Sequence, residues 1–278
     1  MSTLHAIILG IVQGLTEFLP ISSSGHLILV PELFGWTELT DNNSLEKAFD
    51  VALHVGTLVA SLWYFRRDVG HYVVAALRSI RTRSVDTVDA RIAWLLLLTA
   101  IPGALVGAAL SGFIADELGD PVLIGFNLIA FALLLEWSDH TRGTRRADDF
   151  HGRDATVMGI AQALALSPGV SRSGVTITAG RFLGFDRTGA TRLAFLMSIP
   201  ITGGAVLYEA YDVFVKGNGI PPGFGGAFFW GIVSAGVSGF LAIAFLLRFV
   251  QTHTFRPFVI YRLVVGTAAI VIFATGIR

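Results

Sequence analysis

The sequence contains no cysteine. This absence excludes disulfide bonds, thiolate metal sites and a cysteine nucleophile, including the mechanism of the cysteine phosphatases. Charged residues are also scarce, at 14% of the chain, and the formal net charge is zero. An average soluble domain carries about 25% charged residues. Because the net charge gives no general attraction for phosphate backbones, we expect no nucleic-acid partner.

Apolar residues are correspondingly abundant in the sequence. They make up 53% of the chain, and the mean hydropathy is +0.68. Several apolar runs reach the roughly 20 residues that a helix needs to cross a bilayer. The sequence therefore predicts an all-α integral membrane protein with a single membrane domain, residues 1–278. The six segments predicted to cross the bilayer completely are residues 45–65, 92–113, 122–137, 190–213, 227–249 and 258–277.

Two further apolar regions, residues 4–33 and 156–183, are interrupted at their centres. The first contains Pro20 followed by a run of serines, and the second contains Pro168 and Gly169 followed by Ser171. Each half is too short to span the bilayer. A helix that ends inside the membrane leaves backbone groups that must be buried in protein or line a wet cavity. We predict that both regions form re-entrant helical hairpins.

The arginines predict the orientation of the chain. They concentrate in residues 66–91, 138–153 and 248–256, which we interpret as loops between the predicted spans. The positive-inside rule places these three loops in the cytoplasm. Both termini are then expected on the external side of a multi-pass membrane protein.

The two interrupted regions are related in sequence. Residues 10–15 align with residues 159–164, and residues 21–25 align with residues 170–174, with a glutamine, two serines and two glycines among the shared positions. Three predicted crossings separate the copies, and an odd number inverts the second copy. We therefore predict an inverted-topology repeat, residues 1–137 and 153–278, with the hairpin tips facing each other. Chance similarity of small, apolar residues is the alternative.

Ionisable side chains inside the membrane are rare and usually functional. The breaks supply Glu17, His26 and Arg172. Glu17 follows Gln13 by one helical turn, so the two share a face. Glu17 is a candidate cation ligand, general base or partner of Arg172, and a purely structural ion pair is the alternative. His26 could relay a proton, attack phosphorus, or simply pack as a hydrogen-bonded histidine.

The serines at the two breaks are candidate anion ligands. The segments 21–25 and 170–174 place hydroxyls and backbone N–H groups at the start of a helix, a geometry that suits oxyanions. Arg172 adds a guanidinium group suited to phosphate oxygens. Ordinary N-capping by serine is the alternative for each segment.

Other polar and small residues give weaker indications. Asp50 and His54 are one turn apart and either line the same pocket or form a pair at the membrane surface. Arg181 and Arg192 flank the second interrupted region and could simply contact lipid headgroups. Four glycines are interpreted as helix-packing residues: Gly103, Gly107, Gly203 and Gly204.

The two motifs resemble those of the undecaprenyl-diphosphate phosphatase family, also called the bacitracin-resistance family. That family shows Glu or Gln, three residues and Glu, followed by Pro-x-Ser-Ser-x-Gly-His, which here are Gln13, Glu17 and residues 20–26. Its second motif, Pro-Gly-x-Ser-Arg-Ser-x-x-Thr, corresponds to residues 168–176. Both motifs match in order and spacing, and the resemblance extends over the whole chain.

The resemblance implies hydrolysis of undecaprenyl or a similar polyprenyl diphosphate to the monophosphate and inorganic phosphate, which recycles the lipid carrier for cell-envelope glycans. It also implies a divalent cation, Mg²⁺ or Ca²⁺, an active site open to the external face of the plasma membrane, and homodimers. One position departs from many members, because Gln13 stands where they have glutamate. Glu17 is then the principal acidic metal ligand, and Gln13 is a weak one.

We also hypothesise roles for the motif residues. We expect Glu17, Ser23, His26 and Arg172 to be catalytic. Ser23 activated by Glu17 is the first candidate nucleophile, His26 the second and water the third. The expected phosphate ligands are Ser22, Ser24, Gly25, Ser171, Ser173, Gly174 and Thr176.

Two other functions are alternatives to this hypothesis. Another lipid phosphatase superfamily shares a Ser-Gly-His element but needs a histidine six residues after its arginine, where this chain has Thr178. A transporter or flippase for polyprenyl phosphate is the non-enzymatic alternative, and the predicted inverted repeat favours it.

Overall fold

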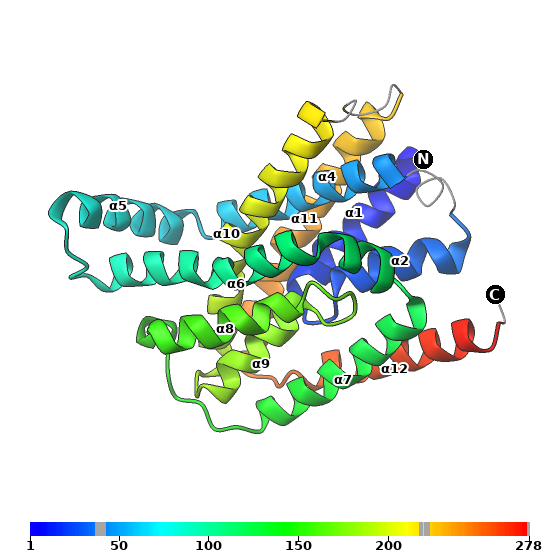
Figure 1. Ribbon diagram of the computed structural model, residues 1–278. Coiled ribbons are helices and arrows are strands. Elements are labelled where there is room, and N and C mark those ends of the chain that lie inside the picture. Colours follow the sequence, from blue (N-terminus) through cyan, green and yellow to red (C-terminus); the bar gives the residue numbers. More distant parts are fainter. Residues whose placement is uncertain (37–42, 217–218, 220–222, 277–278) are drawn as a thin grey trace.

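The computed structural model describes residues 1–36, 43–216, 219 and 223–276. Regular structure in these residues is helical, apart from an isolated bridge between Arg145 and Phe185 (Figure 1). The elements are α1 (Thr3–Phe18), α2 (Ser23–Phe34), α4 (Asn43–Tyr64), α5 (Arg66–Thr82), α6 (Val88–Glu117), α7 (Pro121–Asp139), η1 (Ala147–Asp149), α8 (Gly152–Leu164), α9 (Arg172–Phe182), α10 (Arg187–Tyr211), η2 (Asp212–Lys216), α11 (Gly225–Phe249) and α12 (Arg256–Ala274).

Short polar side chains fix the starts of several helices. Ser2, Thr87, Asp120 and Asp186 each accept a hydrogen bond from the backbone N–H three residues later, at the starts of α1, α6, α7 and α10. Such caps satisfy N–H groups that have no partner within the helix. Helix α7 also has a proline in its first turn, where the missing N–H costs nothing.

The predicted spans correspond to helices. Five helices are long and apolar enough to cross a membrane: Val88–Leu110, Pro121–Asp139, Arg187–Lys216, Gly225–Phe249 and Arg256–Ala274. The predicted span 45–65 corresponds to α4, which meets the same test only together with α5, across a bend of 81°. The protein is therefore all-helical, with five or six membrane-spanning helices among the described residues. Residue 277, the predicted end of the last span, lies outside them.

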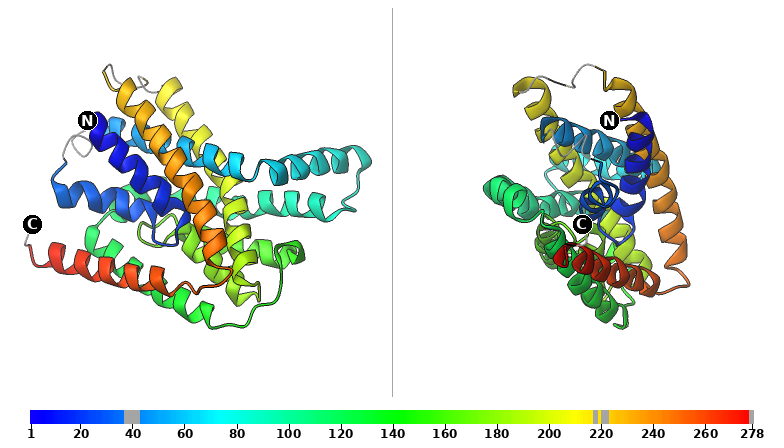
Figure 2. Two further views of the ribbon diagram at one scale, coloured as in Figure 1. Left: turned by 180° about the vertical axis from the view of Figure 1, so that it is seen from behind. Right: turned by 90° about the vertical axis from the view of Figure 1, so that its right-hand side faces the viewer.

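The prediction of a loop over residues 66–91 is wrong. Residues Arg66–Thr82 form α5, and α6 begins at Val88. Together α5 and the first half of α6 form an arm that projects from the other helices (Figures 1 and 2). The arginines of α5 lie near its two ends, and the stretch between them, residues 69–77, is mostly apolar and suits a helix.

Glycines allow some helices to pack with their backbones in contact. A Cβ atom on Gly14 of α1 would lie 2.6 Å from the backbone nitrogen of Gly239 on α11. Gly125 of α7 and Gly266 of α12 face each other in the same way, since a Cβ on Gly125 would lie 2.8 Å from the Gly266 carbonyl oxygen. The interpretation of Gly203 and Gly204 as packing residues is wrong, because a Cβ on either would meet nothing within 4 Å.

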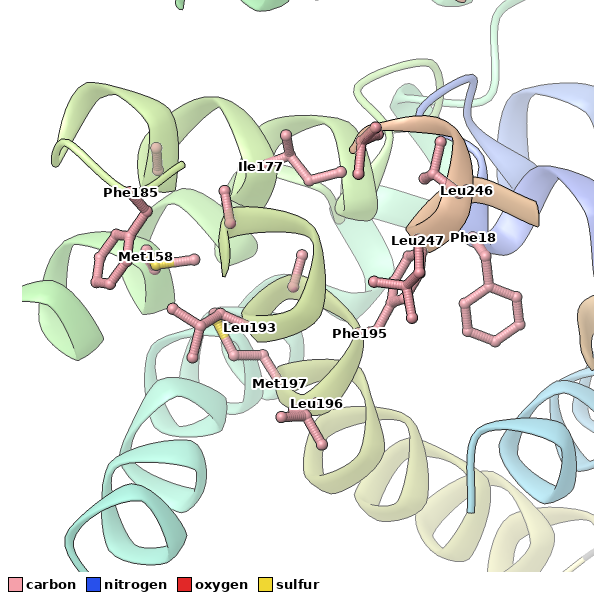
Figure 3. Packing of buried hydrophobic residues seen from close by; sticks show 14 of the residues in the cluster. Phe18, Met158, Ile177, Phe185, Leu193, Phe195, Leu196, Met197, Leu246 and Leu247 are labelled. Atoms are coloured by element: carbon pink, nitrogen blue, oxygen red, sulfur yellow. The ribbon is translucent and has the colours of Figure 1, made fainter. Parts of the chain in front are cut away.

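The largest apolar cluster lies where α8, α9 and α10 meet α1 and α11 (Figure 3). Phe18 of α1 packs edge-on against Phe195 of α10, with 5.4 Å between the ring centroids. Met158, Leu193 and Met197 are fully buried in the same cluster. These contacts fix the two interrupted regions against a common helix, α10.

The predicted breaks are present in both interrupted regions. The first separates α1 from α2 at residues 19–22, and the second separates α8 from α9 at residues 165–171. The two connections lie close together near the centre of the molecule (Figure 1), and the Gly169 N–H donates to the Ser22 hydroxyl at 3.1 Å. The two breaks are therefore in direct contact.

Candidate active site

The two breaks share an unusual backbone conformation. Ser22 has φ 77° and ψ 102°, and Ser171 has φ 70° and ψ 111°. A positive φ is rare for residues other than glycine and must be held in place by its surroundings. Each serine caps the helix that follows, because Ser22 Oγ accepts from the Gly25 N–H and Ser171 Oγ from the Gly174 N–H. The aligned sequences thus fold into the same local structure twice.

A buried arginine that the sequence analysis did not single out connects both breaks. Arg262 of α12 is 0% exposed. Its guanidinium donates to the carbonyl oxygens of Pro20 at 3.2 Å, Gly169 at 2.9 Å and Val170 at 3.0 Å. Its Nε also donates to the Leu128 carbonyl on α7. Arg262 therefore satisfies carbonyl groups that the two breaks release from helical bonding.

Glu17 lies at the end of α1 and binds three side chains. Its Oε1 accepts from Arg172 Nη2 at 2.5 Å, and its Oε2 accepts from Ser23 Oγ at 2.5 Å and from Gln13 Nε2 at 3.2 Å. The side chains of Arg172 and Glu17 are 17% and 6% exposed. The structure therefore brings together Gln13, Glu17, Ser23 and Arg172, which come from both breaks.

Arg172 is oriented by α10 as well as by Glu17. Its Nη1 donates to Thr202 Oγ1 at 2.7 Å and to the Ser198 carbonyl at 3.2 Å. Arg172 is also the first residue of α9, so its side chain lies beside the positive end of that helix. The positive end of α9 and the Arg172 guanidinium therefore lie side by side.

A cavity of about 200 Å³ lies in front of these groups. Arg172, Glu17 and Ser23 line it together with polar and apolar neighbours. The other described lining residues are Ser22, Ser24, His54, Gly103, Gln162, Ala165, Leu166, Ser171, Ile201, Thr202 and Ala205. The starts of α2 and α9 both face this space, so it is suited to an anion.

Several expected site residues lie behind the cavity rather than in its wall. Ser173 is 4% exposed and donates to the Leu19 carbonyl at 3.1 Å. Thr176 is fully buried and donates to the Arg172 carbonyl at 2.7 Å. Gly25 and Gly174 are buried where their N–H groups bond to the capping serines. In this structure these four residues shape the breaks.

His26 also lies outside the cavity lining. Its Nδ1 lies 2.7 Å from the Ser22 carbonyl oxygen, and its Nε2 lies 2.8 Å from the Tyr261 hydroxyl. The His26 and Tyr261 rings are nearly parallel, with centroids 5.6 Å apart. Both ring nitrogens are therefore engaged, and the ring supports the first break.

A second cavity, of about 310 Å³, adjoins the first. Its polar wall contains Glu32, Glu46 and Asp50, while Ser24 and His54 line both cavities. Asp50 and His54 therefore line one pocket, as one of the two alternatives predicted. His54 Nδ1 bonds to the Asp50 backbone carbonyl at 2.8 Å.

The interpretation of Arg181 as a headgroup contact is wrong. Arg181 is 4% exposed, and its guanidinium donates to the carbonyl oxygens of Phe185, at 2.7 Å, and Thr141. Arg192 pairs with Asp68 of α5 at 2.6 Å. Both arginines thus bind other groups of the protein.

Sequence reasoning missed Asn127, Tyr261 and Arg262. Asn127 of α7 donates to Ser167 Oγ at 2.9 Å and to the Pro168 carbonyl at 2.8 Å. A signal was present, because Arg262 is a cation inside a predicted span and such residues are functional candidates. Nothing in the sequence shows which distant carbonyl groups it reaches.

The protein alone offers few cation ligands at the candidate site. Among the described residues, no group of three His, Asp or Glu side chains could hold a metal ion. The Nε2 of Gln13 donates to the carboxylate of Glu17, and the Oε1 of the same amide is buried without a hydrogen-bond partner. These oxygens suit a hard cation such as Mg²⁺ or Ca²⁺ only if other ligands complete its shell.

Comparison with known proteins identifies the family of this chain. The family model of the bacitracin resistance protein BacA matches residues 6–268. The chain belongs to this family. It is 47% identical to an undecaprenyl-diphosphatase of Pelobacter propionicus over 281 residues, which cover 100% of this chain and 99% of that protein. It is 45% identical to an undecaprenyl-diphosphatase of Geobacter sulfurreducens over 274 residues, 97% and 98% of the two chains. Both breaks and the cavity lie within the matched residues.

Proposed function

We propose that this protein is a membrane-embedded phosphatase that hydrolyses undecaprenyl diphosphate to the monophosphate and inorganic phosphate. The reaction recycles the lipid carrier for cell-envelope glycan synthesis. The observation that carries the proposal is the Glu17 carboxylate, which accepts from Ser23 and pairs with Arg172 beside two helix starts. A nucleophile, its base and a phosphate ligand thus face one cavity, and full-length relatives bear the name of this activity.

Ser23 is the nucleophile that the geometry favours. Its hydroxyl donates to Glu17 at 2.5 Å, so attack on the terminal phosphorus passes the proton directly to the carboxylate. The new bond joins Ser23 Oγ to phosphorus, the anhydride P–O bond breaks, and the lipid monophosphate leaves. Water then attacks the phosphoserine, and inorganic phosphate is released. His26, with both ring nitrogens bonded, is assigned to positioning the first break.

Phosphate binding comes from the groups around the nucleophile. Phosphoryl transfer passes through a highly charged transition state, so positioning and charge stabilisation supply most of the catalysis. Arg172 exchanges part of its pairing with Glu17 for phosphate oxygens, while Thr202 holds its other nitrogen. Ser24 and the first N–H groups of α2 and α9 complete the anion site.

A divalent cation, Mg²⁺ or Ca²⁺, is part of this proposal. The Glu17 carboxylate and the free Oε1 of Gln13 are the protein oxygens that would hold it. The diphosphate must provide further ligands, as is usual for Mg²⁺ in phosphate sites. The cation would supply positive charge that neutralises the phosphate oxygens.

The architecture that we propose is an inverted repeat with α4 as the sixth span and both interrupted regions as re-entrant hairpins. The matching conformations of Ser22 and Ser171 support it. So does packing, because Gly10 of α1 fits against α11 while its counterpart Gly159 of α8 fits against α6. We also propose that the cavity faces the external side of the plasma membrane, and the arginines of residues 66–91, 138–153 and 248–256 support this orientation. The homodimer stays a prediction from the resemblance.

The decisive experiment is phosphate release from undecaprenyl diphosphate by the purified protein in detergent, where no transport can occur. We expect Glu17→Gln to lower turnover on the order of 10²–10⁴-fold, because the amide cannot accept the proton of Ser23. Glu136→Gln is the matched control, since Glu136 lies on α7 outside the cavity. The same assay with a metal chelator tests the cation, and we expect release to stop and to return when Mg²⁺ is added.

An inactive wild type that moves lipid phosphate across liposomes would replace the phosphatase with a transporter. A folded Glu17→Gln protein with wild-type turnover would contradict the assignment of Glu17 as the base. Full activity in the presence of the chelator would remove the cation from the proposal.

A further inference from the structure

His54 of α4 stands between the two cavities. It lines the smaller one together with Glu17, Ser23 and Arg172, and it also lines the larger, polar one. Among the described residues, only Ser24 shares this position. Water that moves from the polar cavity toward the reacting groups therefore passes the His54 ring.

The hydrogen bonding of His54 defines which nitrogen is available. Its Nδ1 lies 2.8 Å from the Asp50 carbonyl oxygen, and a carbonyl oxygen can only accept a hydrogen bond. Nδ1 therefore carries the hydrogen, and in the neutral ring Nε2 is a free base. Within the described part of the chain, Nε2 has no hydrogen-bond partner, whereas both nitrogens of His26 are engaged.

The reaction needs a second base at this place. Once Glu17 has taken the proton of Ser23, it cannot accept another from the water that attacks the phosphoserine. Arg172 is a cation and cannot serve. Among the described residues that line the smaller cavity, His54 is the remaining side chain with an unoccupied basic nitrogen.

We propose that His54 is the general base for hydrolysis of the phosphoserine. Its Nε2 takes a proton from the attacking water as the water oxygen bonds to phosphorus. The bond between phosphorus and Ser23 Oγ breaks, and Glu17 returns its proton to the serine oxygen. Inorganic phosphate, free Ser23, ionised Glu17 and protonated His54 result, so atoms and charge balance. The polar cavity beside His54 then receives the proton.

This inference rests on the proposed function but concerns only its second half. Removing the base should leave the attack by Ser23 intact and slow the release of phosphate. The phosphoenzyme should then accumulate. A merely structural role for His54 would slow both halves together, so the balance between them distinguishes the two roles.

The test uses undecaprenyl diphosphate with a radiolabelled terminal phosphate and the purified protein in detergent. For His54→Gln we expect lipid monophosphate to form in the first turnover at the wild-type rate and label to remain on Ser23 after acid quenching. Steady-state phosphate release should fall on the order of 10²–10⁴-fold. For His54→Ala we expect added imidazole to restore part of the steady-state rate.

His140→Gln is the matched control. His140 makes the same kind of bond, from Nδ1 to the Glu136 carbonyl at 2.7 Å, but it is exposed at the end of α7. We expect wild-type kinetics for this variant.

Three outcomes would overturn the inference. Wild-type turnover in His54→Gln would remove His54 from the reaction while the phosphatase function stands. Slow formation of lipid monophosphate in its first turnover would assign His54 to the first half or to structure. An inactive wild type would refute the proposed function itself, and the role of His54 with it.

Discussion

At the scale of single residues, the candidate site separates side chains that face the cavity from side chains that hold the breaks in place. Glu17, Ser23 and Arg172 face the cavity, whereas His26 is held between the Ser22 carbonyl and Tyr261. Burying a charged group is costly unless hydrogen bonds compensate for the lost water. Arg172 has a carboxylate partner, but Arg262, which is more deeply buried, is hydrogen-bonded only to carbonyl oxygens. The unpaired charge of Arg262 is buried at the place where its hydrogen bonds connect the two chain breaks.

We expect Arg262→Met to destabilise the protein by on the order of 3 kcal/mol, because several buried carbonyl groups lose a charged donor. The melting temperature in detergent measures this effect, and phosphate release should be lost as the two breaks separate. Arg256→Met, at an exposed residue at the start of the same helix, is the control and should melt like the wild type. Equal melting temperatures for the two variants would show that Arg262 does not hold the breaks.

At the scale of elements, close contacts between helices position the two interrupted regions. Helix α1 lies against α11 through Gly10 and Gly14, and α8 lies against α6 through Gly159. Backbones that approach this closely leave no room for a side chain, and such contacts are typical of helix packing in membranes. The distance between the two breaks, and so the size of the cavity, depends on these glycines.

We expect Gly14→Ala to destabilise the protein, because the new methyl group would lie 2.6 Å from the Gly239 backbone nitrogen and force α1 away from α11. Overpacking of this kind costs about 1–3 kcal/mol. Gly204→Ala on α10 is the matched control, since its Cβ would meet nothing within 4 Å. Yield and melting temperature in detergent compare the two variants. If both behave alike, close packing of α1 is not required.

At the scale of the whole molecule, the connections between helices lie at two opposite ends of the molecule. Figure 1 shows both termini and the α6–α7 connection on the right, and the α5–α6 connection on the left. The connection between α7 and α8, which holds Arg142, Arg145 and Arg146, lies at the lower left. The positive-inside rule then gives the molecule one orientation in the bilayer.

The absence of native cysteine makes this orientation measurable. We expect a cysteine introduced at Gly119, between α6 and α7, to react with a membrane-impermeant maleimide in intact cells. A cysteine introduced at Asp86, between α5 and α6, should react only after the membrane is opened. The reverse pattern would invert the proposed orientation and place the cavity toward the cytoplasm.

The sequence alone predicted the helical class, most of the spans and the two breaks, because apolar runs and their interruption are local features of the chain. It also predicted that Glu17 and Arg172 could pair, since two charges inside a membrane need partners. It did not predict helix α5, because the arginines along that segment suggested a loop. Nor did it predict that Gly10 and Gly14, rather than Gly203 and Gly204, pack closely.

Only the tertiary structure decided which motif residues face the cavity. Ser23 and Ser173 both belong to serine-rich motifs, yet the first donates to Glu17 and the second donates to the Leu19 carbonyl. The tertiary structure also brought Arg262 and His54 to the site from helices far away along the chain. Sequence spacing fixes neighbours along one helix, but the burial and partners of a side chain depend on which other helices pack against it.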